Sequence, residues 1–235
     1  MASASPDVPA LAWDDFLARI DWRQGEHVSL IGPTGSGKTT LALALLPRRS
    51  FVIALGTKPK DRTLDKLVSS GWRKIRAIKG LPEHVADYKT FRMVFWPPFK
   101  DDADVARQAH QIGAVMRWAF VNHNWCVYVD ELWYLERVLG LQRLVEMLLT
   151  QGRSVGVSVV VGTQRPAHVS LLIYDQPTHL FFWKDNDERN LKRIAGINGL
   201  ASALIRVTVS SLAPHECLYV NTRTGFMART TAPEG

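Results

Sequence analysis

The chain has 235 residues, and its 46% hydrophobic and 22% charged residues are typical of a folded globular domain rather than of a disordered chain. This length suits one α/β domain better than two. Lys and Arg outnumber Asp and Glu by 29 to 22, and the formal net charge of +7 favours a polyanionic partner such as nucleic acid, although solubility alone would also explain it.

The cysteines and the lack of long apolar runs indicate the expected cellular location of the chain. Cys126 and Cys217 lie in apolar stretches with no second pair to form a metal site, and we expect them to be reduced core thiols. The sequence carries neither a secretory signal nor an apolar run of about 18 residues. We therefore expect a soluble cytoplasmic protein that does not insert into a membrane by itself.

The first 23 residues are predicted to form a loose lead-in and a short helix, followed by a single domain over residues 24–235. Leu11, Phe16 and Ile20 recur at helical spacing, which predicts an amphipathic helix packed against that domain. Trp22 or Arg23 could instead flank a bound adenine, but core packing is the simpler interpretation.

A glycine-rich segment between an apolar strand and a helix is the strongest motif in the chain. The strand is predicted over 28–31 and the helix over 40–46, and between them runs Gly32-Pro33-Thr34-Gly35-Ser36-Gly37-Lys38-Thr39. Glycines let backbone N–H groups curl around a phosphate, and the helix directs its positive dipole end at it. Lys38 is then expected to reach the β- and γ-phosphates and Thr39 to bind Mg²⁺, with Thr40 completing the binding segment. The alternative is a glycine-rich turn that matches by chance.

Two basic segments follow, and each has two interpretations. After a buried strand predicted over 51–55, Lys58 and Lys60 lie at a strand's carboxyl end, where they could meet phosphates or form a solvated turn. The basic run over 72–79 could face DNA, but an ordinary strand with a charged outer face is slightly favoured. A strand over 91–96 and a long helix over 102–121 come next.

Two adjacent carboxylates end the following strand, predicted over 125–129. Asp130 is placed to hold the Mg²⁺ shell, and Glu131, in a partly desolvated site, to act as general base for the attacking water. The alternative is a pair of solvated residues opening a helix. An acidic pair beside a P-loop favours hydrolysis over the phosphorylation of a small metabolite.

The next strand places an amide and an arginine at its opposite ends. A helix over 134–151 leads to Arg153, then to a strand over 157–162 and to Gln164, which is expected to sense the γ-phosphate. About ten extended residues span roughly 30 Å, so Arg153 and Gln164 are not expected to serve the same nucleotide. A catalytic Arg153 would have to act on a neighbouring subunit, which predicts a ring. The alternative role for Arg153 is to complement a helix dipole.

The carboxyl-terminal part is predicted to add a strand over 178–183, a helix over 185–194 with Asp185 as its N-cap, and a terminal β-hairpin over 217–228. Arg189, Lys192 and Arg193 on this helix are either a solvated face or DNA contacts. The histidines show no metal-ligand spacing and receive no role.

Together, the Walker A motif at 32–39, the Walker B motif at 127–131 and the segments Gly152–Gly156 and Gly162–Pro166 resemble the FtsK–HerA superfamily of P-loop ATPases. The resemblance covers about residues 24–230 and implies a RecA-like α/β fold, with a mostly parallel sheet flanked by helices. It further implies ATP and Mg²⁺ as cofactors, a pentameric or hexameric ring and double-stranded DNA as partner. It assigns Gln164 as γ-phosphate sensor and Arg153 as arginine finger in trans, with Arg165 as second candidate.

The expected lack of membrane segments and of an added barrel makes the chain look most like the viral genome-packaging ATPases of this superfamily. That subgroup implies host cytoplasm as location and a capsid portal or a membrane protein as a further partner. The alternative is an ATP-binding factor for virion assembly or secretion, similar to zonula-occludens-toxin-like proteins, which acts on protein partners.

Overall fold

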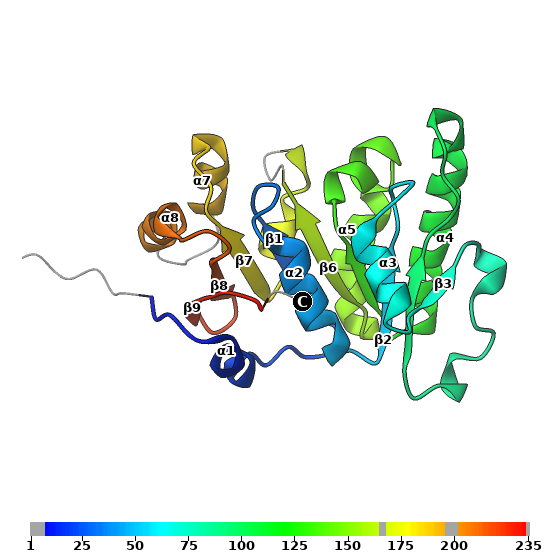
Figure 1. The fold of residues 1–235 in the computed structure, drawn as a ribbon, viewed down its shortest axis with the longest axis horizontal. Helices are drawn as coiled ribbons and strands as arrows, with labels where there is room; N and C mark the ends of the chain where they lie inside the picture. Colours follow the sequence, from blue (N-terminus) through cyan, green and yellow to red (C-terminus); the bar gives the residue numbers. More distant parts are fainter. Residues whose placement is uncertain (1–7, 165–167, 196–201, 234–235) are drawn as a thin grey trace, which may run out of the picture.

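In the computed structural model, which describes residues 8–164, 168–195 and 202–233, these residues build a nine-stranded sheet in the order β3-β4-β2-β5-β6-β1-β7-β8-β9 (Figure 1). The strands are β1 Val28–Ile31, β2 Phe51–Leu55, β3 Arg73–Ile75, β4 Phe91–Phe95, β5 Cys126–Val129, β6 Ser158–Thr163, β7 His179–Trp183, β8 Cys217–Asn221 and β9 Met227–Thr230. All pairings from β3 to β7 are parallel, and those of β8 and β9 are antiparallel. The α/β fold with a carboxyl-terminal hairpin is confirmed.

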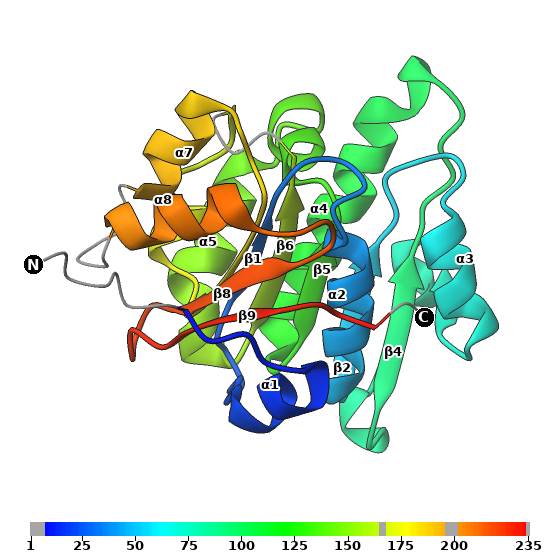
Figure 2. The same cartoon turned by 60° about the vertical axis from the view of Figure 1, so that its left-hand side comes forward.

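Helices cover both faces of the sheet, because the central strands are apolar on both faces and must be buried on each. The helices are α1 Trp13–Arg19, α2 Lys38–Leu45, α3 Arg62–Ser69, α4 Val105–Asn122, α5 Gln142–Gln151, α6 Leu172–Asp175, α7 Glu188–Ala195 and α8 Ser202–Ser211. Buried side chains of α1, α2 and α3 share one core with one side of the strands, and those of α4 to α8 share the other (Figure 2). Within β1, Leu30 belongs to the first core and Ile31 to the second, as the alternation of a strand requires.

The strand order separates the two motif-bearing strands. β6 lies between β1, which leads into the glycine-rich loop, and β5, which ends in the acidic pair. Ile31 at the end of β1 pairs with Thr163 at the end of β6, and Val129 at the end of β5 pairs with Val161. Parallel pairing in this register brings all three strand ends to one edge of the sheet.

The helix predicted over 134–151 is broken. The chain forms a single π-helical stretch at Tyr134–Val138, turns at Gly140, where φ is +64°, and resumes as α5. A left-handed residue ends a right-handed helix, so the expectation of one continuous helix was wrong. The helix predicted over 185–194 also begins later, because Asp187 rather than Asp185 accepts the backbone N–H of Arg189 and forms the cap.

The amino-terminal segment packs against the end of the sheet. Leu11 donates its N–H to the carbonyl of Arg229 at 2.8 Å, and Arg229 donates its N–H to the carbonyl of Pro9 at 2.8 Å. Phe16 of α1 is fully buried, with its ring edge against Tyr219. Among the described residues, no helix combines the length and apolarity needed to cross a bilayer.

Candidate active site

The loop after β1 has the geometry that its glycines predict. At Gly37 the backbone has φ +107°, a value that residues with a side chain rarely adopt, and α2 begins at the next residue. At Gly32 an added Cβ would lie 2.7 Å from Cβ of Trp183, so only glycine fits between the loop and β7. The N–H groups at the start of α2 are thus presented to the loop's interior, as an anion site requires.

Lys38 is folded into this loop. Its Nζ donates to the carbonyls of Gly32 at 2.7 Å and Pro33 at 2.6 Å, and the residue is only 7% exposed. Burial lowers the pKa of Lys38, and the negative charges of Asp130 and Glu131 oppose that shift. The ammonium is therefore held among loop groups, where a phosphate would become its natural partner.

Asp130 accepts one hydrogen bond from the start of α2 and one from its own strand, β5. Its Oδ1 accepts hydrogen bonds from Thr39 Oγ1 at 2.8 Å and from the hydroxyl of Tyr128 at 2.7 Å. The sequence-predicted metal ligands Thr39 and Asp130 are thus in direct contact, with a hydroxyl and a carboxylate, the hard oxygen donors that Mg²⁺ prefers. Tyr128 was not predicted as a site residue. Burial and the charge of Asp130 raise its pKa, so it remains a neutral donor.

Lys58 provides a second cation beside Asp130. Its Nζ lies 3.5 Å from Asp130 Oδ2 and 3.7 Å from Asp61 Oδ2, so this lysine reaches the acidic pair although its side chain remains about half exposed. Two side chains hold its backbone segment, since Trp96 Nε1 donates to the carbonyl of Lys58 at 2.7 Å and Gln108 Nε2 to that of Thr57 at 3.0 Å. Gln108 is fully buried, which fixes the position of this segment.

Glu131, two residues after β5, lies in a partly buried environment. Burial raises the pKa of its carboxyl group, while a hydrogen bond from the N–H of Trp133, at 3.3 Å to Oε1, and the charge of Lys38 act in the opposite direction. A carboxylate with a raised pKa accepts a proton more readily near neutral pH. The expectation of a partly desolvated carboxylate is therefore confirmed.

Gln164 meets the loop directly, and Arg153 does not. Thr34 donates its hydroxyl hydrogen to Gln164 Oε1, which places the amide next to the phosphate loop. Arg153 lies in the 3₁₀ turn Gly152–Val155 that precedes the amino end of β6, at the opposite edge of the sheet. β6 has six residues and spans about 20 Å rather than the expected 30 Å, but its two ends still face different edges. Arg165 lies outside the described residues.

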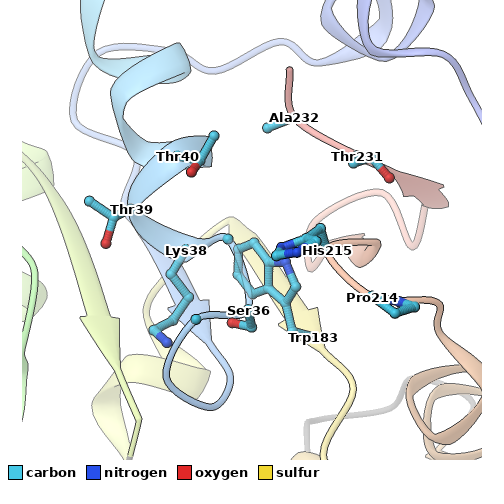
Figure 3. A pocket seen from close by; sticks show the side chains of 11 residues that line it. Ser36, Lys38, Thr39, Thr40, Trp183, Pro214, His215, Thr231 and Ala232 are labelled. Carbon is cyan, nitrogen blue, oxygen red and sulfur yellow. The ribbon is translucent and has the colours of Figure 1, made fainter. Parts of the chain in front are cut away.

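A pocket beside the loop was missed by the sequence interpretation. Its volume is about 550 Å³, and besides residues 35–40 it is lined by Trp183, Pro214, His215, Thr231 and Ala232 (Figure 3). Figure 3 shows Trp183 and His215 among the side chains that line the pocket, together with Ser36. Within the described part of the chain, Trp183 Nε1 and Ser36 Oγ are buried without a hydrogen-bond partner, which a bound polar group would relieve.

Trp22, a sequence candidate for flanking an adenine, has a structural role. Its Nε1 donates to the carbonyl of Glu26 at 2.9 Å, and the guanidinium of Arg49 lies 3.9 Å from its ring centroid. It is 8% exposed and does not line the pocket beside the loop. Trp183 could have been proposed from the sequence as a pocket residue, because it ends a predicted strand. His215 could not, because it belongs to no recognisable motif.

Solved structures with the same arrangement identify the fold, although no protein-family model and no curated protein matches the chain. The DNA-packaging ATPase B204 of Sulfolobus turreted icosahedral virus is similar with a TM-score of 0.62 and 15% identity, over 91% of this chain and all of that one. The genome-packaging NTPase B204 of Sulfolobus turreted icosahedral virus 2, in complex with AMPPCP, has a TM-score of 0.62 and 14% sequence identity, over 89% of this chain and 98% of that one. VirB4 of Thermoanaerobacter pseudethanolicus has a TM-score of 0.62 and 12% sequence identity, over 89% of this chain and 90% of that one.

The fold is that of the P-loop ATPases. The resemblance based on the two Walker motifs and on the sequence segments Gly152–Gly156 and Gly162–Pro166 is confirmed at this level, with viral packaging and VirB4-type proteins among the neighbours. In the chain itself, the fold brings Lys38, Thr39, Asp130, Glu131 and Gln164 to one edge and leaves Arg153 at the other.

Proposed function

We propose that this chain is an ATP-hydrolysing ring motor that translocates double-stranded DNA, in the packaging of a viral genome. The observation that carries the proposal is the position of β6 between β1 and β5. It puts Gln164 in contact with Thr34 of the phosphate loop and leaves the acidic pair on the other side of the same strand end. A nucleotide's terminal phosphate at this edge would face a cation, a metal-binding pair, a base and a sensor.

Each residue then has a distinct part in hydrolysis. The loop N–H groups and Lys38 hold the phosphates, while Thr39 and Asp130 hold Mg²⁺, which neutralises charge on the phosphate oxygens when bound. Glu131 orients a water and accepts its proton, and Gln164 contacts the terminal phosphate. Trp183 and His215 offer a surface on which an adenine can stack.

The ring part of the proposal rests on Arg153. This side chain is exposed, and its guanidinium has no ion pair or hydrogen bond to any residue that the structure describes. The segment just before β1 holds the turn that carries Arg153. Gln24 Nε2 donates to the carbonyl of Gly156 at 2.5 Å, and the N–H of Gly25 donates to Ser158 Oγ at 3.0 Å. A rigidly mounted, unpaired arginine at the edge opposite the phosphate loop suits action on the next subunit, with Arg165 as second candidate.

Double-stranded DNA as substrate is supported by the excess of basic residues and by the two B204 structures, which are described as packaging enzymes. A packaging motor would also dock on a capsid portal or a membrane protein. The alternative, an assembly or secretion ATPase acting on protein, is supported by similarity to the cytoplasmic domain of the type VII secretion ATPase EccC from Thermomonospora curvata. That structure gives a TM-score of 0.56 and 16% identity, over 89% of this chain and 25% of that one.

An ATPase assay with and without duplex DNA, with the assembly mass measured in parallel, distinguishes these functions. For the DNA motor we expect turnover stimulated by DNA, with a stimulation that falls steeply with salt, and a mass of five or six subunits. Lys38→Ala serves as the inactive control. A turnover indifferent to any nucleic acid would favour the protein-acting alternative, and a chain without turnover would overturn both.

A further inference from the structure

A basic groove lies at the far end of the sheet from α7 and α8. It has a volume of about 350 Å³ and is bounded by four segments, the loop after β2, helix α3, the end of β3 and the loop after β4. Its cationic residues are Lys60, Lys74, Arg76 and Lys100, and its one acidic lining residue is Asp65. Figure 1 shows β3 at the opposite end of the molecule from α7.

The positive charge in the groove is little neutralised. Lys74 lies 3.6 Å from Asp65, while no ion pair of the side chains of Lys60, Arg76 or Lys100 is found among the described residues. The acidic run that follows Lys100 lies close to it, since Asp104 Oδ2 accepts the backbone N–H of Lys100 at 2.8 Å. Asp104 pairs with Arg107 at 2.6 Å, and Asp101 caps the N–H of Ala103 at 3.0 Å.

The floor of the groove is aromatic and connected to the active site. The Lys74 ammonium lies 3.9 Å from the ring centroid of Trp96, and Phe99 forms part of the same wall. Trp96 is 7% exposed, and its Nε1 holds the carbonyl of Lys58, whose ammonium lies beside Asp130. Trp96 thus lines the groove and also contacts the segment that carries Lys58.

We propose that this groove binds the phosphate backbone of duplex DNA, and that α7, the other basic segment, does not. The proposal rests on the proposed DNA-motor function and names the surface that the motor uses. Cations from three segments match a ligand that carries one charge per ~3.4 Å along each strand. On α7, by contrast, Arg189 lies 3.6 Å from Asp187, and Arg193 donates to the carbonyl of Val169 at 3.2 Å.

The test compares two double variants with the same loss of charge. Arg76→Ala with Lys100→Ala removes two groove cations, and Arg189→Ala with Lys192→Ala removes two from α7. Duplex binding is measured by fluorescence anisotropy over a salt series. Losing two phosphate contacts should make the slope of log K against log salt shallower by about 1.8 and weaken binding roughly tenfold or more at low salt. The α7 variant should stay within about twofold of the parent protein.

A second readout separates a binding defect from misfolding. ATP hydrolysis without DNA should be the same in both variants as in the parent protein, because neither pair contacts the phosphate loop or the acidic pair. Stimulation by DNA should be lost in the groove variant alone.

Three outcomes overturn the proposal. Equal loss in both variants, or loss only in the α7 variant, would place DNA elsewhere while leaving the DNA motor intact. Displacement of DNA by polyglutamate of matched charge would identify an acidic protein as occupant. A parent protein that hydrolyses ATP but binds no duplex would refute the DNA-motor function itself, together with this surface.

Discussion

The two edges of the sheet treat their polar groups differently. At the carboxyl edge, groups are left poised: the Lys38 ammonium rests on loop carbonyls, and burial raises the pKa of Glu131. Ser36 Oγ and Trp183 Nε1 are buried there without a partner in the described chain. Such groups destabilise the fold unless a ligand satisfies them, which is characteristic of binding sites.

At the amino edge, one buried network is paired throughout, although His27 Nε2, Arg49 Nε and Trp125 Nε1 are buried there without a hydrogen-bond partner among the described residues. Glu26 is 3% exposed, and its carboxylate contacts His179 Nε2 at 2.9 Å and the guanidinium of Arg223. His179 Nδ1 lies 2.8 Å from the hydroxyl of Tyr219, so the network ties β7 to the hairpin. Arg153 is exposed at this edge and forms no ion pair with any residue that the structure describes. The comparison predicts that changes at one edge alter chemistry and that most changes at the other alter stability.

Arg153 is the exception to that division, and its removal should have the largest effect. If it completes the neighbouring site, Arg153→Ala should lower ATP turnover by ~10³ to 10⁵. If the subunits hydrolyse in strict sequence, activity in mixtures with the parent chain should fall more steeply than the parent fraction, because one altered interface stops the whole ring. Arg23→Ala, at the same edge, is the matched control, since Arg23 is paired with Asp21 at 2.6 Å. Full activity of Arg153→Ala would contradict the trans role.

The second-largest effect is expected for Glu131→Gln, which should lower ATP turnover by ~10² to 10⁴, as expected when a general base is removed. Binding of a fluorescent ATP analogue should persist, because the phosphate loop is unchanged. Glu136→Gln is the control. Glu136 is also buried with a raised pKa, but it accepts the N–H of Ser170 at 3.1 Å away from the loop. Equal turnover in Glu131→Gln and the parent protein would remove Glu131 from the mechanism.

His27 tests the stability of the amino edge. Burial lowers the pKa of His27 to about 4, and its Nδ1 accepts the N–H of Val159 at 3.0 Å. Between the ordinary histidine pKa and that value, the unfolded chain binds a proton that the native chain does not. Stability should therefore fall as the pH drops from about 6.5 to 4, by up to ~3 kcal/mol from this residue.

Urea unfolding between pH 7 and pH 4 measures this loss. His27→Gln keeps an acceptor for Val159 and removes the titrating group, so its unfolding free energy should depend less on pH. Identical pH profiles for the variant and the parent protein would show that His27 does not supply the dependence.

The carboxyl edge also shows how far a sequence can be interpreted. The buried strands are apolar runs, and Gly37, Asp130 and Gln164 each follow such a run, so their meeting at one edge could be predicted. The pocket formed with His215 could not, because only the antiparallel return of β8 and β9 brings residues 214–215 and 231–232 to the loop. The break at Gly140 was missed since the flanking apolar spacing is helical on both sides.

The sequence could not decide whether Lys58 meets phosphates or lies in a solvated turn, because its partner Asp130 follows a different strand. Its contact with Asp130 predicts the smallest effect. The ammonium opposes a divalent cation at that carboxylate, so Lys58→Met should lower the Mg²⁺ concentration for half-maximal nucleotide binding roughly two- to fivefold, a modest change because both side chains are partly exposed. Titration of Mg²⁺ against a fluorescent ATP analogue measures it, with Lys60→Met as control. A rise in the half-maximal concentration would instead mean that Lys58 helps to hold the phosphates.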